Sequence, residues 1–129
     1  MILTTNFANM KKLPDSVEPV SIAIFPPKSV KIRCCSRFFP PRDLLRKYKA
    51  KELGDAEYKE IYRREVLAKL DAGDAGRALD GKALVCYEKA GDFCHRHLVA
   101  EWFNAHGIEC KEFEPNPSKN NEDVLISLF

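Results

Sequence analysis

Short apolar segments alternate with amphipathic segments along this chain, and few folds can accommodate that order. Four segments rich in β-branched and apolar side chains predict strands: residues 2–5, 19–25, 82–88 and 108–114. Three segments with apolar side chains at helical spacing predict helices: residues 40–49, 55–70 and 92–106. Strands alternating with helices favour a parallel sheet with right-handed crossovers. We therefore expect one α/β domain over residues 1–129, with a small Rossmann-like sheet of four to five strands and helices on both faces.

Residues at the segment boundaries predict where several elements begin and end. Asp55 and Asp92 precede helical segments and are the expected N-caps, and Gly107 is the expected residue after the last helix. Gly73 and Gly76 are expected to interrupt helical structure. Residues 28–39 are interpreted as irregular, and Tyr58 and Tyr62 as core contacts. The apolar tail, residues 124–129, is compatible with an edge strand, a short helix or a self-association surface.

Composition narrows the class of protein. No run approaches the ~20 consecutive apolar residues that cross a bilayer, and the first residues lack the cationic region of a secretory signal. The five cysteines form no spaced framework, which favours a reducing compartment. We therefore expect a cytoplasmic protein without membrane contact. Both a monomer and a homodimer are compatible with the sequence.

Positive charge is concentrated in one segment. Residues 28–51 contain nine basic residues and one acidic residue, a net charge of +8, whereas the rest of the chain carries −6. Such asymmetry predicts an anionic partner, and the alternative is a solvated loop and helix face. The candidate nucleic-acid contacts are Lys31, Arg33, Arg37, Arg46 and Lys47.

Three residues with reactive or charged side chains lie shortly after Asp92. If Asp92 caps the helix, Cys94, His95 and Arg96 lie in its first turn, where backbone amides and the helix dipole favour negative charge. A thiol at that position is acidified, and a guanidinium binds carboxylate or phosphate. The cluster predicts an anion-binding site for a nucleotide, a phosphate or nucleic acid.

The candidate roles follow from the residue types. Cys94 is the candidate nucleophile or redox thiol, His95 the proton shuttle, Arg96 the anion clamp and Glu88 the orienting carboxylate. Arg96 is also a candidate ligand contact, together with Cys86 and Asn6.

Two other functions remain open. The chain is alternatively a non-catalytic nucleic-acid-binding module that uses residues 28–51, or a structural domain in which Arg96 simply pairs with Glu88. In those cases Cys94 is a buried, inert residue and His95 an ordinary surface residue.

Several better-known sites do not fit. A tyrosine-phosphatase loop needs an arginine six residues after its cysteine, but Asp92 follows Cys86 at that distance. A dinucleotide fingerprint needs several glycines, and only Gly91 lies between the strand and the helix. The cysteines lack the paired spacing of a zinc site, so we expect no metal and no cofactor. A bond between Cys34 and Cys35 would be a strained vicinal disulfide, so we interpret both as incidental.

The segments 84–89 and 93–100 resemble a bacterial family called domain of unknown function 488. The family pattern is an apolar strand ending in Cys-x-Glu, followed by Cys-His-Arg and an apolar helix, as in Leu84–Lys89 and Phe93–Ala100. The resemblance extends over most of the chain and implies that Cys86, Glu88, Cys94, His95 and Arg96 are signature residues. The chain departs from the pattern at residues 23–27, where the family carries a polar residue and glycine. The family name implies a fold and a site but no reaction.

Overall fold

The computed structural model describes residues 1–87 and 95–115, and within them five strands form one parallel sheet. The strands are β1 (Ile2–Asn6), β2 (Glu18–Ser21), β3 (Arg33–Cys34), β4 (Lys82–Cys86) and β5 (Cys110–Glu112). Their order is β3-β2-β4-β1-β5, and every neighbouring pair is parallel. The expected α/β class with a small, Rossmann-like parallel sheet is confirmed.

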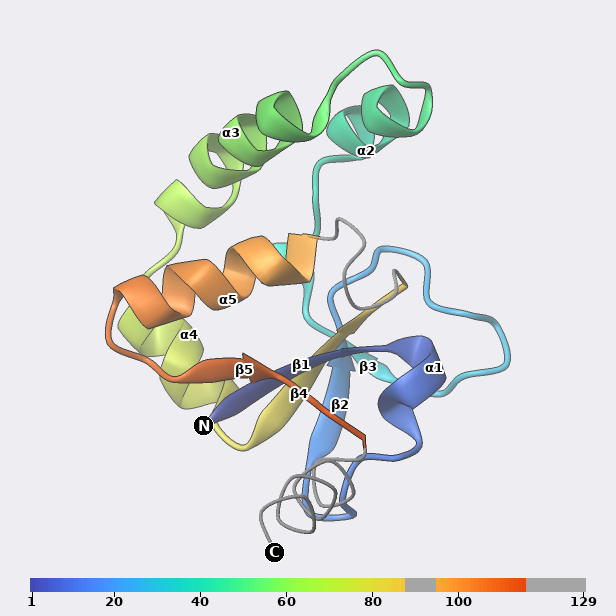
Figure 1. Ribbon diagram of the computed structural model, residues 1–129, viewed down its shortest axis with the longest axis vertical. Helices are drawn as coiled ribbons and strands as arrows, with labels where there is room; N and C mark the ends of the chain where they lie inside the picture. Colours follow the sequence, from blue (N-terminus) through green and yellow to red (C-terminus); the bar gives the residue numbers. More distant parts are fainter. Residues whose placement is uncertain (88–94, 116–129) are drawn as a thin grey trace, which may run out of the picture.

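Five α-helices connect these strands in the described residues. They are α1 (Phe7–Met10), α2 (Arg42–Lys49), α3 (Asp55–Glu65), α4 (Ala72–Leu79) and α5 (His95–Ala105). Two short 3₁₀ segments, η1 (Ser36–Phe38) and η2 (Leu67–Lys69), precede α2 and follow α3. Helix α5 runs along the sheet, and α2 and α3 lie side by side at one end of the molecule (Figure 1). None of the helices in the described part of the chain is long and apolar enough to cross a membrane.

The hydrophobic core lies between one face of the sheet and the helices. Ile2, Val20 and Leu84 contribute buried side chains from the three central strands, and Leu98 and Phe103 contribute buried side chains from α5. Apolar positions three and four residues apart on α5 produce this buried face. The core therefore fixes where α5 begins relative to the strand ends.

Strand β2 is shorter than expected because its last side chain turns the chain away. The Ser21 hydroxyl donates to the Ala23 carbonyl at 3.0 Å and accepts the Ala23 N–H at 3.2 Å. Such local serine bonds compete with the sheet ladder. The Ile22 N–H still donates to the Val85 carbonyl oxygen of β4 at 3.0 Å, and the residues after Ile22 leave the sheet and lie beyond the strand ends. The segment 28–39, interpreted as irregular, instead contributes β3 at the sheet edge.

Helix α4 was not expected, because two glycines seemed to prevent it. The Asp71 side chain accepts the Asp74 N–H at 2.9 Å and so caps its first turn. A Cβ at Gly76 would come within 2.9 Å of the Ile108 side chain, so the missing side chain allows a close approach. Gly73 and Gly76 are therefore accommodated inside a helix, and the expected interruption is wrong.

Two of the three expected boundary residues can be compared with the structure. The N-cap of α3 is Gly54, and Asp55 is the first helical residue, whose carboxylate accepts the Tyr48 hydroxyl at 2.6 Å. The expectation for Asp55 is thus wrong by one residue. Gly107 has a φ of 78° after α5, as expected for the residue that ends a helix. Asp92 and the apolar tail lie outside the described residues.

Candidate functional site

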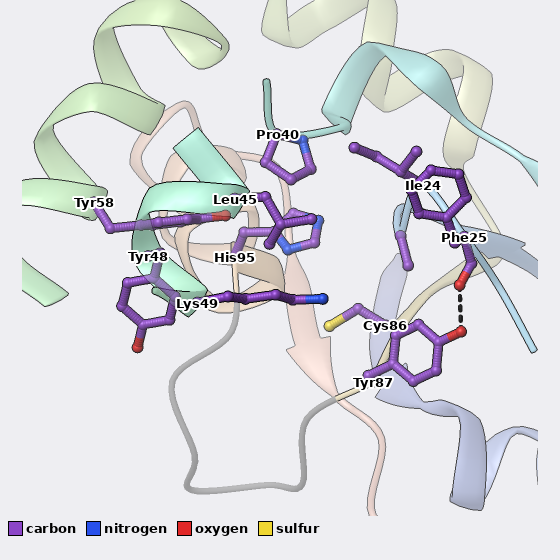
Figure 2. A pocket seen from close by; sticks show the side chains of 11 residues that line it. Ile24, Phe25, Pro40, Leu45, Tyr48, Lys49, Tyr58, Cys86, Tyr87 and His95 are labelled. Atoms are coloured by element: carbon purple, nitrogen blue, oxygen red, sulfur yellow. Dashed lines mark hydrogen bonds between the residues drawn. The ribbon is translucent and has the colours of Figure 1, made fainter. Parts of the chain in front are cut away.

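A pocket of about 290 Å³ lies at the carboxyl ends of β2 and β4. In open parallel sheets this edge is where ligands bind. The chain after β2, the end of β4, helix α2, one residue of α3 and the start of α5 form its walls (Figure 2). The lining residues are Ala23, Ile24, Phe25, Pro40, Leu45, Tyr48, Lys49, Tyr58, Cys86, Tyr87 and His95. The wall is mostly apolar with a few polar groups, as is typical of small-molecule pockets.

Cys86 places a sulfur atom in this wall. It is the last residue of β4 and is almost fully buried. The Nη1 atom of Arg96 donates a hydrogen bond to its Sγ at 3.2 Å. Cys86 is disulfide-bonded, whereas Cys34, Cys35 and Cys110 are free. The pocket wall thus combines a disulfide sulfur with an adjacent cation.

Arg96 is held by a carboxylate from a different strand. Its Nε and Nη2 atoms donate to the two oxygens of Glu112 at 3.0 and 2.9 Å, a bidentate pair. Glu112 also accepts the Thr4 hydroxyl at 2.6 Å. The Arg96 side chain is 0% exposed and that of Glu112 is 28% exposed. This network ties α5 to β5, β1 and β4, and it directs one edge of the guanidinium at the Cys86 sulfur.

His95 is a neutral, buried residue of the same wall. Its Nε2 atom lies 2.8 Å from the Ile22 carbonyl oxygen, which can only accept, so Nε2 carries the hydrogen. Burial is the main cause that lowers the pKa of His95 to about 4, and the neighbouring Arg96 charge acts in the same direction. The ring also packs edge-on against Tyr62. At neutral pH, therefore, His95 contributes an uncharged imidazole.

Lys49 supplies the positive charge that faces the pocket. Its amino group points toward the Cys86 sulfur across the pocket in Figure 2. On the same helix, Arg46 and Lys47 both pair with Asp43, whereas Lys49 has no ion-pair partner among the described residues. The pocket therefore presents an amine that can receive an anionic group.

A family model matches a large part of the chain. The family model DUF488-N3a, described as the active DUF488-N3 subclade, matches residues 26–107. That range is more than half of the chain and includes β4 and all of α5. The chain belongs to the DUF488-N3a family. No curated protein and no solved structure is significantly similar to it.

For this DUF488-N3a protein, the structure shows the positions of only some of the candidate site residues. Glu88 and Cys94 lie outside the described residues. His95 and Cys86 lie together in the pocket wall. Asn6 caps α1, and its side chain accepts the Asn9 N–H at 2.9 Å, so the local helix uses the group expected to contact ligand. Arg96 lies behind the wall rather than in it, because Glu112 and Cys86 occupy its guanidinium.

The expected nucleic-acid contacts are dispersed and partly neutralised. Arg33 pairs with Glu18 at 3.4 Å, and Arg46 and Lys47 pair with Asp43 at 2.7 and 3.3 Å. Lys31 and Arg37 are exposed. The sequence count of +8, which already includes Asp43, overstates the unpaired charge of this segment, because Glu18 and Glu52 from outside it lie against Arg33 and Arg46.

Other side chains with metal-binding or redox potential lie outside the pocket. Burial raises the pKa of Cys35, and it raises that of Cys110 to about 12. Among residues 1–87 and 95–115, no group of three His, Cys, Asp or Glu side chains is arranged to hold a metal ion. Among the described residues, the closest association of a sulfur atom with a cation is therefore at the pocket wall that contains Cys86.

Three members of this site were missed by the sequence reasoning. Glu112 has no motif, and only its position on β5, opposite Thr4 in the register, brings it to Arg96. Lys49 was counted with the basic segment, although it follows Arg46 and Lys47, the two residues that pair with Asp43. Tyr58 was interpreted as core, and it is buried, but its ring also lines the pocket. The helical spacing of α2 and α3 could have identified the last two, but not Glu112.

Proposed function

We propose that this protein is a thiol-dependent enzyme that acts on a phosphate-bearing small molecule in the pocket at the carboxyl ends of β2 and β4. One observation carries the proposal: the buried guanidinium of Arg96 donates a hydrogen bond at 3.2 Å to the Cys86 sulfur in the pocket wall. A cation beside a thiol stabilises its thiolate, which is the nucleophilic form. The description of the matched family as the active subclade supports an enzyme.

The proposal changes the role of Arg96. A side chain that is 0% exposed and paired with Glu112 is poorly placed to clamp a substrate. Arg96 instead acts on the sulfur as a positioning residue, and Glu112 holds it in orientation. Lys49 takes the role of the anion-binding cation, because its amino group faces the pocket.

His95 takes a hydrogen-bonding role in this proposal. A pKa of about 4 leaves the imidazole uncharged at neutral pH and makes it a weak base. Its bond to the Ile22 carbonyl holds the ring between β4 and the chain that follows β2. The proton-shuttle role predicted from the sequence is therefore less suitable than a role in shaping the wall.

The sulfur chemistry requires reduction before turnover. A dithiol reductant cleaves the disulfide of Cys86, so that two thiols form and the reductant becomes a cyclic disulfide. Cys94 lies outside the described residues and keeps its predicted role as a reactive thiol.

In the reduced protein, the Cys86 thiolate attacks an electrophilic atom of the substrate. A bond from sulfur to that atom forms while the bond to the leaving group breaks, and the leaving group departs with the electron pair and takes a proton from water. A second water molecule then cleaves the covalent intermediate and restores the thiol. Glu88, also outside the described residues, remains the predicted orienting carboxylate.

The test measures how readily Cys86 ionises. Thiolate absorbance near 240 nm is followed against pH in phosphine-reduced protein, for the wild type, Cys86→Ser and the control Cys34→Ser. We expect an ionisation below pH ~7 that Cys86→Ser removes and that Cys34→Ser retains. Persistence of this ionisation in Cys86→Ser, or its absence from the wild type, overturns the proposal. Alkylation rates of each cysteine in the reduced wild type provide the same comparison without a variant.

A second experiment tests catalysis. Phosphate-bearing small molecules are incubated with reduced and oxidised protein, and conversion is followed by phosphorus NMR. We expect conversion by the reduced wild type and by reduced Cys34→Ser, and none by Cys86→Ser. Conversion by Cys86→Ser at the wild-type rate, or no conversion of any substrate by the reduced wild type, contradicts the assignment.

A further inference from the structure

Two exposed aromatic rings stand at the mouth of the pocket. Phe25 and Tyr87 are 62% and 50% exposed, and with Met1 they are the large exposed hydrophobic side chains of the described residues. They are joined, because the Tyr87 hydroxyl donates to the Phe25 carbonyl oxygen (Figure 2). The ring of Tyr87 also contacts Phe7, with centroids 4.9 Å apart. The mouth therefore has a fixed aromatic rim from two different strand ends.

Two cations without ion pairs lie at the same rim. The Arg42 guanidinium lies 5.4 Å from the centre of the Phe25 ring, and the Lys49 amine faces the pocket interior. Neither has an ion-pair partner in the part of the chain that the structure describes, and none of the eleven lining residues is acidic. Between them on α2, Arg46 and Lys47 are paired with Asp43. The uncompensated charge of α2 is thus confined to the residues at the pocket.

We propose that the pocket binds a nucleoside phosphate, with the base against Phe25 and Tyr87 and the phosphate at Lys49. The inference rests on the proposed function, since it names the substrate class of the same site. A base stacks on exposed aromatic rings, and a phosphate pairs with lysine and arginine. A sugar phosphate uses only the cations, and a neutral aromatic molecule uses only the rings. A nucleotide uses both.

The size of the pocket limits the ligand to one nucleotide. Its volume of about 290 Å³ is at the lower end of ligand pockets, which span roughly 300–1,000 Å³. Such a volume leaves no room for a second nucleotide within the walls. The nucleoside phosphate is therefore a free mononucleotide or the terminal nucleotide of a strand.

Calorimetric titration of the protein in its disulfide-bonded form tests this inference without turnover. The probes are a nucleoside 5′-monophosphate, the matching nucleoside, ribose 5-phosphate and a short single-stranded oligonucleotide with a terminal phosphate. We expect the monophosphate to bind at least about tenfold more tightly than the nucleoside or the sugar phosphate, as for the loss of one charge-assisted contact or one stacked ring. If the oligonucleotide binds more tightly than the monophosphate, the natural ligand is the terminal nucleotide of a strand. If it does not, the natural ligand is a free nucleotide.

Two variants and a matched control locate the binding. Lys49→Met and Phe25→Ala are each expected to weaken monophosphate binding by about tenfold. Lys47→Met, on the same helix but paired with Asp43, is expected to leave it unchanged. Equal effects of Lys49→Met and Lys47→Met, or no saturable binding of any probe, overturn the inference. If no probe binds but Cys86 ionises below pH ~7 in the reduced protein, only the ligand class is overturned. If Cys86 does not ionise below pH ~7, the proposed function is overturned.

Discussion

Replacing Glu112 by alanine is expected to cost more stability than replacing its partner Arg96 by methionine. The two side chains differ in exposure, at 28% for Glu112 and 0% for Arg96. Without Glu112, the guanidinium keeps its charge in a buried site and loses the two hydrogen bonds that it donates to that carboxylate. Without Arg96, Glu112 remains partly hydrated and keeps the hydrogen bond from Thr4. The cost therefore depends on which charge is left behind.

The magnitudes follow from this asymmetry. Removing one partner of a buried ion pair costs about 3–5 kcal/mol when the remaining charge is buried, as it is in Glu112→Ala. Arg96→Met removes the buried charge and fills much of its volume, so its cost should be limited to the lost hydrogen bonds, about 1–3 kcal/mol. In the double variant, Glu112→Ala with Arg96→Met, the buried guanidinium is absent, so the loss of stability should be close to that of Arg96→Met alone. Against a total stability of about 5–15 kcal/mol, the Glu112→Ala loss is large.

Urea unfolding under reducing conditions, followed by far-ultraviolet circular dichroism, measures these differences. Arg63→Met is the matched control, because Arg63 pairs with Glu101 at 3.0 Å while both side chains are more than half exposed. Its cost should be no more than ~1 kcal/mol. A Glu112→Ala loss as small as that of Arg63→Met, or additive losses in the double variant, would refute the reasoning.

Two further predictions concern His95 and Gly76. The pKa of His95 is about 4 in the folded protein and near 6.5 in the unfolded chain, so the unfolded state binds more protons between these values and stability falls as pH decreases through this range. Between pH 7 and pH 5 the wild type should lose about 2 kcal/mol more than His95→Gln in urea unfolding. Parallel curves of stability against pH for His95→Gln and the wild type would show the linkage to be absent. Gly76→Val should lower stability by about 1–3 kcal/mol through overpacking against Ile108, and adding Ile108→Ala should recover part of the loss in thermal unfolding; no recovery would mean that another contact causes it.

Much of the fold was predictable because its signals are local. The strands β1 and β4 and the helix α5 each have continuous apolar character or helical spacing, and these patterns survive in the structure. Strand β3 has only two residues, so no periodicity can mark it. Helix α4 contains two glycines, and its stability depends on the Asp71 cap and on packing against Ile108, which is distant in the sequence.

The candidate site was predictable only as far as its residues are neighbours in the chain. His95 and Arg96 were identified from their position after a predicted strand, and Cys86 from the family resemblance. The direction of the Arg96 side chain was not predictable, because it is decided by Glu112 on a strand that pairs with β1. Likewise, the position of His95 in the first turn of a predicted helix gave no indication that its ring would bond to the Ile22 carbonyl oxygen.

The two outermost strands, β3 with two residues and β5 with three, are the shortest in the sheet. An edge strand exposes unpaired amides and carbonyls, on which a second chain can assemble. Here each of these edges offers only a few such groups, and each carries a charged side chain, Arg33 on one side and Lys111 on the other. The described sheet therefore provides little template for growth into fibrils, even though its central strands are strongly apolar.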